Sequence, residues 1–435
     1  MLKTLLSFCL LFYSISGFAQ NLHLKNVNII DVESGKLLPQ KEIVVTDGKI
    51  ASFKSKKRKV KNYQVIDGQG RYVIPGLFEM HAHIGIPNRN YLDTFLKYGI
   101  TGVRVMAGSE GVLAWRDSIS MDLMSGPNLF IASPLYDGNP PLWADNHSGP
   151  VLENISQVER LVKAHQQKGY NEIKVYNRLP AEVYLEILRA ADAAGMRVSG
   201  HIPYTLTSND FGDPRHTSIE HLDGFIQFAT SQSPAMEQGK EESARMSLYP
   251  YYDKAKLAPY SNRIKQNKVW LCPTLSLYGN FNSAEVHEEL NEVKHLAPTN
   301  GLMGWWLSLP EQVGESFKVK FDFNRQVLQD HFLDYADHIL AGTDSPNPYN
   351  LPGLALHHEL QHLTEAGFSN AAVLKIATYN AANYLGVLDM HGTVAIGKYA
   401  NLLLLDGNPL VDIQNTKKIH QVLVKGQIKT AKINY

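Results

Sequence analysis

The chain has 435 residues, of which 44% are hydrophobic and 19% are charged, so its composition is that of a globular protein and excludes extended disorder. Its 42 basic and 42 acidic residues balance, which removes the electrostatic basis for binding nucleic acid or an anionic membrane. This length exceeds what one hydrophobic core usually spans and predicts a large domain with a smaller companion.

The N-terminus has the features of an export signal. Residues 1–20 begin with a cationic start at Lys3, continue with an apolar run, and end with the small residues Gly17 and Ala19. No later segment reaches the roughly 18 uninterrupted apolar residues that a membrane helix needs. We therefore expect residues 1–20 to be a signal peptide and the mature chain to be periplasmic or extracellular, without membrane insertion. Cys272, which would then be the remaining cysteine, lies in an apolar run that predicts a buried structural thiol.

Short strands and turns mark both ends of the mature chain. In residues 21–75, alternating apolar residues are interrupted by the turn signals Asp47-Gly48 and Asp67-Gly68, and a similar pattern returns in residues 385–435. Neither segment has enough strands to bury both faces alone, so the two segments are predicted to form one β-sandwich. The basic run at residues 54–61 is predicted to be a solvated hairpin tip.

Apolar strands alternate with amphipathic helices in residues 76–384. Eight such strands predict a (β/α)8 TIM barrel of the α/β class. Residues 154–169 and 180–195 are helix candidates, and residues 280–337 are a candidate insertion that covers the substrate. The strand candidates are residues 77–84, 101–107, 128–134, 172–177, 197–203, 218–224, 270–275 and 338–344.

Two histidines end the first of these strands. Alternate residues of a strand point to the same side, so His81 and His83 project together. At the carboxyl end of a barrel strand, that side is the mouth where barrel enzymes keep their active sites. An HxH pair alone is weak evidence, because two histidines can equally be core residues.

Four further polar residues occupy the ends of later apolar strands: Lys174, His201, His221 and Asp344. Taken singly, each has a structural explanation, such as a satisfied buried histidine or a helix cap. Taken together with the HxH pair, they predict a metal site, because the rest of those strands is apolar.

Neutral imidazoles and a carboxylate suit a borderline divalent ion such as Zn²⁺. Lys174 does not fit as an ammonium, because two cations would repel it. It fits as a neutral amine that has captured CO₂, since the resulting carbamate can bridge two metals. A cationic, desolvated site favours the neutral amine that this reaction requires.

These residues resemble the amidohydrolase superfamily of metal-dependent hydrolases. PGLFEMHAHIG is similar to its PGhhDxHxH motif, LAGTDSPNPYNLPG to its strand-eight segment, and GTVAIGKYANLLLLDGNPL to its C-terminal β-strand region. The combination of EIKVYNRLP, SGHIP, IEHLDG and CPTL is most similar to the group of Xaa-Pro dipeptidases and imidazolonepropionase-related proteins. The resemblance covers nearly all of the mature chain.

The resemblance implies two metal ions that are bound by six ligands. It places His81, His83 and Asp344 at one ion, His201 and His221 at the other, and carbamylated Lys174 between them. It also implies a bridging hydroxide as nucleophile, with Asp344 as the catalytic general base and acid. Glu79 replaces the family's usual Asp and is expected to support the site rather than bind metal.

The substrate contacts are less defined by the sequence. Tyr176 and Arg178 follow Lys174, where they could hold a carbonyl oxygen or a carboxylate, although loop packing explains them equally well. The loop containing Trp143 and His147 is a candidate pocket wall. Histidines at 357, 358 and 362 lie on a predicted helix and are expected to be surface residues, because the HExxH motif is absent.

The leading hypothesis is an exported hydrolase that cleaves an amide bond of a dipeptide or N-acyl amino acid with two divalent ions, zinc being expected. Opening of a lactone or cyclic amide at the same site is the enzymatic alternative. An inactive envelope binding protein is the alternative from another class, and the intact ligand set argues against it. The expected partner is a small-molecule substrate, without nucleic acid, and a homo-oligomer is compatible with the sequence.

Overall fold

The structure is a computed structural model that describes residues 21–53, 63–85, 89–143, 149–232, 240–293 and 306–431. The predicted signal peptide at residues 1–20 and the basic run at residues 54–61 lie outside these ranges and stay predictions. Within the described ranges, every helix is too short or too polar to cross a bilayer.

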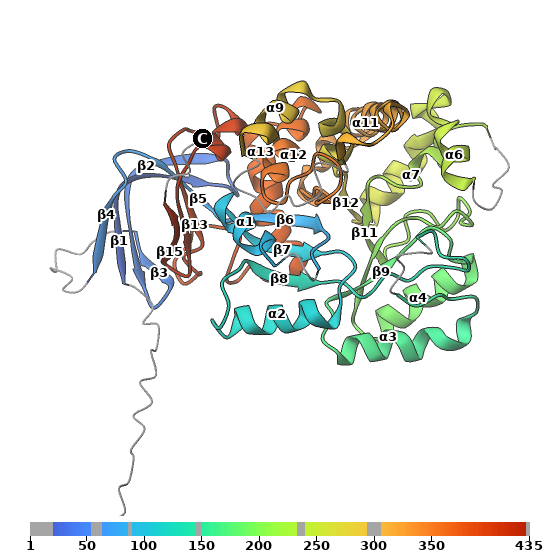
Figure 1. The fold of residues 1–435 in the computed structure, drawn as a ribbon, viewed down its shortest axis with the longest axis horizontal. Coiled ribbons are helices and arrows are strands. Elements are labelled where there is room, and N and C mark those ends of the chain that lie inside the picture. The colour runs from blue at the N-terminus through green and yellow to red at the C-terminus, as the bar shows by residue number, and fades with distance from the viewer. Residues whose placement is uncertain are drawn as a thin grey trace, which may run out of the picture.

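Both ends of the chain build one β-sheet (Figure 1). Its order is β15-β14-β13-β5-β1-β2-β3, with β4 paired to β1. The N- and C-terminal segments meet where β13 pairs antiparallel with β5, Leu402 opposite Pro75. The predicted pairing of the two ends is confirmed, but as one eight-stranded sheet rather than the two sheets of a sandwich. The strands are β1 (Leu22–Asp31), β2 (Lys36–Thr46), β3 (Lys49–Ser52), β4 (Gln64–Asp67), β5 (Tyr72–Pro75), β13 (Leu402–Leu405), β14 (Ile419–Val424) and β15 (Gln427–Ala431).

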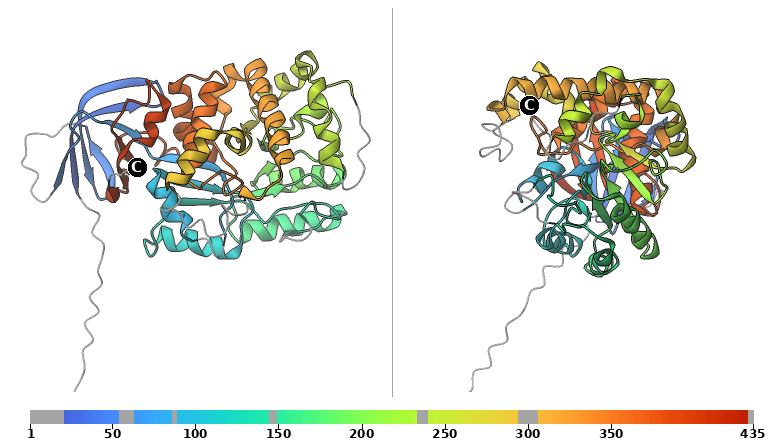
Figure 2. Two further views of the ribbon diagram at one scale, coloured as in Figure 1. Left: turned by 45° about the horizontal axis from the view of Figure 1, so that its top comes forward. Right: turned by 90° about the vertical axis from the view of Figure 1, so that its right-hand side faces the viewer.

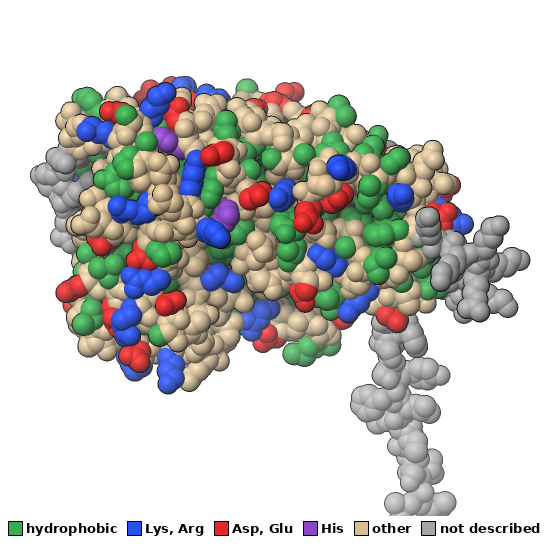
Figure 3. Space-filling view, turned by 180° about the vertical axis from the view of Figure 1, so that it is seen from behind, with side chains coloured by type: hydrophobic (Ala, Val, Ile, Leu, Met, Phe, Trp, Pro, Cys, Tyr) green, Lys and Arg blue, Asp and Glu red, His purple; other side chains and the backbone are tan. Residues whose placement is uncertain are grey.

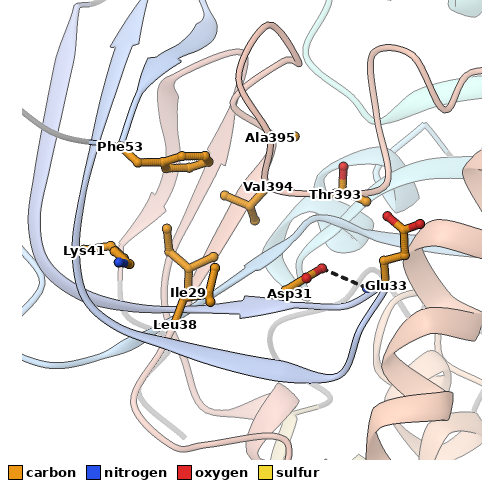
Figure 4. A pocket seen from close by; sticks show the side chains of 9 residues that line it. All are labelled: Ile29, Asp31, Glu33, Leu38, Lys41, Phe53, Thr393, Val394 and Ala395. Carbon is orange, nitrogen blue, oxygen red and sulfur yellow. Dashed lines mark hydrogen bonds between the residues drawn. The ribbon is translucent and has the colours of Figure 1, made fainter.

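The terminal sheet has a core of its own. Leu24, Ile43, Leu402 and Leu404 come from both segments and are fully buried in one apolar cluster. A cavity of about 440 Å³ also lies in this unit, and Figure 4 shows the Phe53 ring and its apolar neighbours facing into it.

The central strands run parallel in two sheets. The first has the order β6-β7-β8 and the second β12-β11-β10-β9. Seven of the eight predicted strands are therefore confirmed. They are β6 (Leu77–Ala82), β7 (Ile100–Val105), β8 (Asn128–Ile131), β9 (Glu172–Val175), β10 (Arg197–Gly200), β11 (His216–Glu220) and β12 (Trp270–Cys272).

The eighth predicted strand is irregular. Residues 339–345 make isolated parallel bridges, Ile339 with Leu271 of β12 and Ser345 with Ala82 of β6. The Leu340 amide donates to the Leu271 carbonyl at 2.8 Å. The prediction of a regular strand over residues 338–344 is wrong: residues 340–344 form no regular strand, and Asp344 at the end of this segment has a positive φ of 58°. The segment nevertheless lies between β12 and β6, and the fold is a mixed α/β arrangement with a terminal β-sheet.

Helices flank the parallel strands on two sides (Figures 1 and 2), with α2, α3 and α4 on one side and α12 and α13 on the other. The two predicted helices are confirmed as α3 and α4. Each is followed by a glycine with positive φ, Gly169 at 84° and Gly195 at 66°. The helices are α1 (Tyr91–Lys97), α2 (Glu110–Ser120), α3 (Val158–Gln167), α4 (Ala181–Ala193), α5 (Phe225–Phe228), α6 (Glu241–Met246), α7 (Lys254–Gln266), α8 (Leu275–Gly279), α9 (Ala284–Val293), α11 (Glu311–His331), α12 (Leu354–Glu365), α13 (Asn370–Lys375) and α14 (Ala381–Leu385).

Charges of both signs are mixed on the surface. Figure 3 shows Lys and Arg side chains interspersed with Asp and Glu on the face opposite to that of Figure 1. This distribution matches the zero formal net charge of the sequence.

Candidate metal centre

The six predicted ligands come together at one cavity of about 800 Å³. Each lies at or just beyond the carboxyl end of a parallel strand, or in the segment that replaces the eighth strand. Parallel strands end at the same edge of a sheet, which is why residues so distant in sequence meet. They are His81 and His83 at β6, Lys174 in β9, His201 after β10, His221 after β11, and Asp344 in the irregular segment.

Asp344 lies at the centre of this group. Its Oδ1 atom is 2.9 Å from His83 Nε2 and 3.4 Å from His81 Nε2, and its Oδ2 atom is 3.8 Å from His221 Nε2. Donor atoms of His81, His221 and Asp344 all lie within 4.8 Å of one another, and the three residues are buried. The His201 ring centroid is 4.8 Å from that of His221, so the fourth histidine adjoins the same group.

Three buried polar atoms at this cavity lack a well-aligned hydrogen bond to the described residues: His81 Nε2, Lys174 Nζ and, despite its 2.9 Å distance from His83 Nε2, Asp344 Oδ1. Buried polar groups are nearly always bonded, so three such atoms around one cavity need another partner. Imidazole nitrogen and carboxylate oxygen are ligands that zinc accepts. The residues therefore fit divalent metal ions.

Three of the histidines are oriented by a hydrogen bond at the other ring nitrogen. His81 Nδ1 is 2.6 Å from Glu220 Oε2, His201 Nδ1 is 2.7 Å from Asn177 Oδ1, and His221 Nδ1 is 2.7 Å from Thr274 Oγ1. Such bonds fix the ring and tautomer of metal-binding histidines.

Glu220 is held as a charged partner of His81 rather than as an additional ligand. Its Oε1 atom accepts hydrogen bonds from Arg104 Nη2 at 2.7 Å and from Ser218 Oγ at 2.6 Å. Burial alone would raise the pKa of the Glu220 carboxyl, but the Arg104 guanidinium and His81 hold it well below its usual range. The buried carboxylate therefore favours a proton on His81 Nδ1 and leaves Nε2 as the lone-pair donor facing the cavity.

The environment favours the protonation states that metal ligands require. Burial, reinforced by the Lys174 charge, lowers the pKa of His81 to about 4. Burial also lowers the pKa of Lys174. At Asp344 burial acts in the opposite direction, but the surrounding imidazoles keep the pKa of its carboxyl below its ordinary value. At neutral pH the site thus presents a neutral imidazole at His81, a carboxylate at Asp344 and, at Lys174, an amine that loses its proton more readily than usual.

Glu79 supports the backbone of the site. Its Oε1 atom accepts hydrogen bonds from the His81 and Thr343 amides, both at 2.9 Å, and its Oε2 atom accepts one from Thr343 Oγ1 at 2.7 Å. These bonds join the HxH strand to the segment that carries Asp344. Burial raises the pKa of Glu79 to about 8.

The structure separates the two predicted substrate contacts. Tyr176 lines the cavity, its ring centroid lies 4.0 Å from that of His201, and its hydroxyl accepts a 2.7 Å hydrogen bond from Trp143 Nε1. Arg178 is not among the described lining residues. Its guanidinium donates to Glu241 Oε2 at 3.1 Å and to the Pro140 carbonyl at 3.2 Å, so it anchors a loop. His147 of that loop lies outside the described residues.

Two elements after β12 contribute to the cavity wall: α8, which precedes the predicted insertion at residues 280–337, and α11, which lies within it. Leu277 and Tyr278 of α8 and Ser316, Phe317 and Lys320 of α11 all line the cavity. The sequence did not single out Lys320, because one lysine on an amphipathic helix resembles any solvated residue. Asn177 and Thr274 were missed as well, although both lie in the quoted motifs EIKVYNRLP and CPTL.

The prediction that the histidines of α12 are surface residues is wrong. His357, His358 and His362 are 2%, 3% and 9% exposed. His357 lies 3.0 Å from the Tyr98 carbonyl, and His358 Nε2 lies 2.8 Å from Glu289 Oε2. Their polar atoms thus have protein partners, which allows α12 to bury this face.

A model of the amidohydrolase family matches residues 72–429, and the chain belongs to this family. Hydrolases of this family act on carbon–nitrogen bonds. The match includes all six residues of the candidate centre.

Individual relatives are distant. An adenine deaminase from Bacillus licheniformis is 24% identical over 188 residues, which is 41% of this chain but only 31% of the deaminase. Among solved structures, bottromycin amidohydrolase has a TM-score of 0.71 with 23% identity, over 94% of this chain and 86% of that one. A Xaa-Pro dipeptidase with bound methionine in the active site has a TM-score of 0.66 with 19% identity, over 94% and 99% of the two chains. At these identities the two structures show a shared fold.

Proposed function

We propose that this protein is a binuclear metal-dependent amidohydrolase that cleaves the amide bond of a dipeptide or an N-acyl amino acid. The observation that carries the proposal is the meeting of His81 Nε2, Lys174 Nζ and Asp344 Oδ1, all buried and lacking a well-aligned hydrogen bond to the described residues, beside three further histidines. No hydrophobic or hydrogen-bonding role accounts for that set.

The residues divide into two ligand sets. His81, His83 and Asp344 would hold one ion, and His201 and His221 the other, with Lys174 between them as a CO₂-derived carbamate. Zinc is the ion that this donor set favours. When bound, two such ions supply Lewis acidity and lower the pKa of a water molecule toward neutrality.

Asp344 is suited to move the proton. Its carboxyl stays ionised because neighbouring imidazoles lower its pKa, so it can accept a proton and later return it to the leaving nitrogen. Tyr176 is suited to hold the substrate. Its hydroxyl oxygen accepts the Trp143 N–H, which leaves the phenolic O–H to donate to a substrate oxygen.

The parallel strands are proposed to function as one (β/α)8 barrel. The Ser133 amide donates to the Glu172 carbonyl at 2.8 Å and joins the first sheet to the second. Residues 339–345 bridge the remaining gap between β12 and β6. This continuity explains why all six ligands reach the same rim.

A dipeptide or N-acyl amino acid suits the dimensions and walls of the cavity. A volume of about 800 Å³ falls within the range of small-molecule sites, and the wall combines polar groups at the histidines with aromatic side chains elsewhere. The fold shared with a Xaa-Pro dipeptidase supports the same substrate class.

The central test is the Lys174→Ala variant, assayed on a panel of Xaa-Pro and other dipeptides, N-acyl amino acids, lactones and imidazolones. We expect kcat/KM of the variant to fall by the equivalent of at least about 3 kcal/mol, because groups at a metal site act as a unit. Partial rescue by a short added carboxylic acid would support the bridging carbamate. Lys168→Ala is a control, since Lys168 is half exposed and pairs with Glu110 on the surface.

Three results would redirect the proposal. Near-wild-type turnover by Lys174→Ala would exclude the two-metal mechanism. Preference for lactones or imidazolones over linear amides would assign the alternative ring-opening activity. Failure of the protein to retain metal after incubation with zinc and bicarbonate, measured by elemental analysis, would favour a binding protein.

A further inference from the structure

Arg245 on α6 is a charged side chain buried behind the candidate metal centre. It is 1% exposed, and its Nη1 atom donates to both carboxylate oxygens of Asp223 at 2.9 Å. Its Nη2 atom donates to the Ile202 carbonyl at 2.9 Å and to Gln227 Oε1. The guanidinium also lies against the Tyr204 ring, with its Cζ atom 4.2 Å from the ring centroid. Contacts on several sides therefore hold this buried cation in one position.

A chain of hydrogen bonds leads from Arg245 to His201, one of the candidate ligands. Asp223 Oδ2 accepts a bond from Asn177 Nδ2 at 2.9 Å, and Asn177 Oδ1 lies 2.7 Å from His201 Nδ1. An ionised carboxylate can only accept, so Asn177 must turn its NH₂ group to Asp223 and its oxygen to the imidazole. The ring nitrogen that faces this oxygen must then carry the proton, which leaves His201 Nε2 as the lone-pair donor for a metal.

The helix that carries Arg245 also forms part of the cavity wall, through Ser243 and Met246. A second ion pair attaches the same helix, because Glu241 Oε2 lies 3.1 Å from Arg178 Nη2. One ion pair of α6 thus continues through hydrogen bonds to a candidate ligand, and the other anchors a loop. The two can be removed separately, which distinguishes the attachment of α6 from the orientation of the histidine.

We propose that Arg245 is a positioning residue of the metal centre, which fixes the His201 ring through Asp223 and Asn177. This inference rests on the proposed function, because it concerns the ion assigned to His201 and His221. It adds that the affinity for this ion depends on a side chain that is not among the described residues of the cavity wall.

The experiment measures zinc affinity by competition with a chromogenic chelator in wild type, Arg245→Met, Asn177→Ala and the double variant. Arg178→Met is the matched control, because it removes the other arginine that pairs with α6. Circular dichroism and thermal melting establish that each variant folds. If Arg245→Met does not fold, Arg245→Lys replaces it, since lysine keeps the buried charge pair but lacks the planar fork that bonds several acceptors together.

We expect wild type and Arg178→Met to bind two zinc ions with the same affinities. In Arg245→Met, the affinity for one ion should fall by about tenfold or more, and the other should be unchanged. Asn177→Ala should show the same selective loss, and adding Arg245→Met to it should weaken binding no further, because the chain of bonds is already broken.

Three results would overturn the inference and leave the hydrolase proposal intact. The first is full zinc affinity in Arg245→Met, or in Arg245→Lys where that variant replaces it. The second is an equal loss in Arg178→Met, which would show that attachment of α6 is what matters. The third is a further loss in the double variant, as expected if Arg245 only stabilises the fold.

Nitrogen NMR of the metal-free protein, labelled with ¹⁵N-histidine, tests the same chain without zinc. We expect a slowly exchanging Nδ1–H signal, assigned to His201 by its absence in His201→Gln, in wild type and Arg178→Met and its loss in Arg245→Met. Failure of wild type to bind zinc contradicts the proposed function, whereas this pattern would still support the positioning role. An unchanged signal in Arg245→Met would exclude that role.

Discussion

Hydrogen bonds from residues outside the set of candidate ligands orient the histidines of this site. Thr274, Asn177 and Glu220 each bond the Nδ1 atom of one histidine, and each comes from a different strand end or following loop. The partner decides which nitrogen carries the proton and therefore which nitrogen can bind metal. The metal affinity of the centre should thus depend on residues beyond the six ligands.

Thr274 offers the sharpest test of this dependence. Its side chain is fully buried, and its hydroxyl is 2.7 Å from His221 Nδ1. We expect Thr274→Ala to weaken zinc binding by about 10- to 100-fold, because the His221 ring loses its orienting bond. Thr274→Ser keeps the hydroxyl and should retain most of the affinity. Competition with a chromogenic chelator measures both, and equal affinities for Ala and Ser would contradict the orienting role.

At the scale of elements, α12 is unusual in burying three histidines on one helix. His357 lies between the Tyr98 carbonyl and Thr416 Oγ1, the latter 2.9 Å from its Nδ1 atom, in the turn Ile413–Lys417. The helix therefore joins the end of α1 to the C-terminal segment through imidazole hydrogen bonds. Burial, rather than these bonds, disfavours the protonated form of the His357 ring.

This arrangement predicts acid sensitivity. Burial lowers the pKa of His357 to about 3, whereas an unfolded histidine titrates near 6.5. Between those values the unfolded state binds more protons, so stability is full above about pH 6.5 and falls as the pH drops toward 3. His357 alone should cost about 2 kcal/mol between pH 7 and pH 5. Urea unfolding of wild type and His357→Gln at both pH values measures this difference, and identical pH dependence in the two proteins would refute it.

At the scale of the whole molecule, the hydrophobic core of the terminal sheet and the cavity of the candidate site lie in different parts of the fold. The terminal sheet packs its own cluster, while the cavity lies at the ends of the parallel strands. The two are linked because β5 leads within two residues into β6, which carries His81. Stability of the sheet and chemistry at the cavity should therefore respond to different substitutions.

Leu404 tests this separation. It is fully buried in the sheet core, and Leu404→Ala should destabilise the protein by about 2–5 kcal/mol through lost burial and a residual cavity. Leu37→Ala, at a strand position that is 39% exposed, should change stability by no more than about 0.5 kcal/mol. Denaturant midpoints give the stabilities. A large loss of kcat in folded Leu404→Ala would show that the sheet and the cavity are coupled.

The sequence was sufficient to identify the six candidate ligands, seven parallel strands and the pairing of the two chain ends. The ligands and strands follow from local features: a polar residue closing an apolar strand, period-two alternation, and glycines after helices can all be read along the chain. His81, Lys174 and Asp344 were recognisable because strand ends carry their own pattern.

Only the tertiary structure decided which side chains accompany the ligands. The contacts of Thr274 with His221, of Glu220 with His81, and of Arg178 with the Pro140 loop depend on how distant segments pack, and no spacing in the sequence encodes them. The same holds for the burial of the α12 histidines, whose partners come from four different segments, and for Lys320, which resembles a surface lysine until α11 folds over the cavity. The local sequence pattern determines which ligand residue stands at each strand end, whereas packing of distant segments determines which side chains contact that residue.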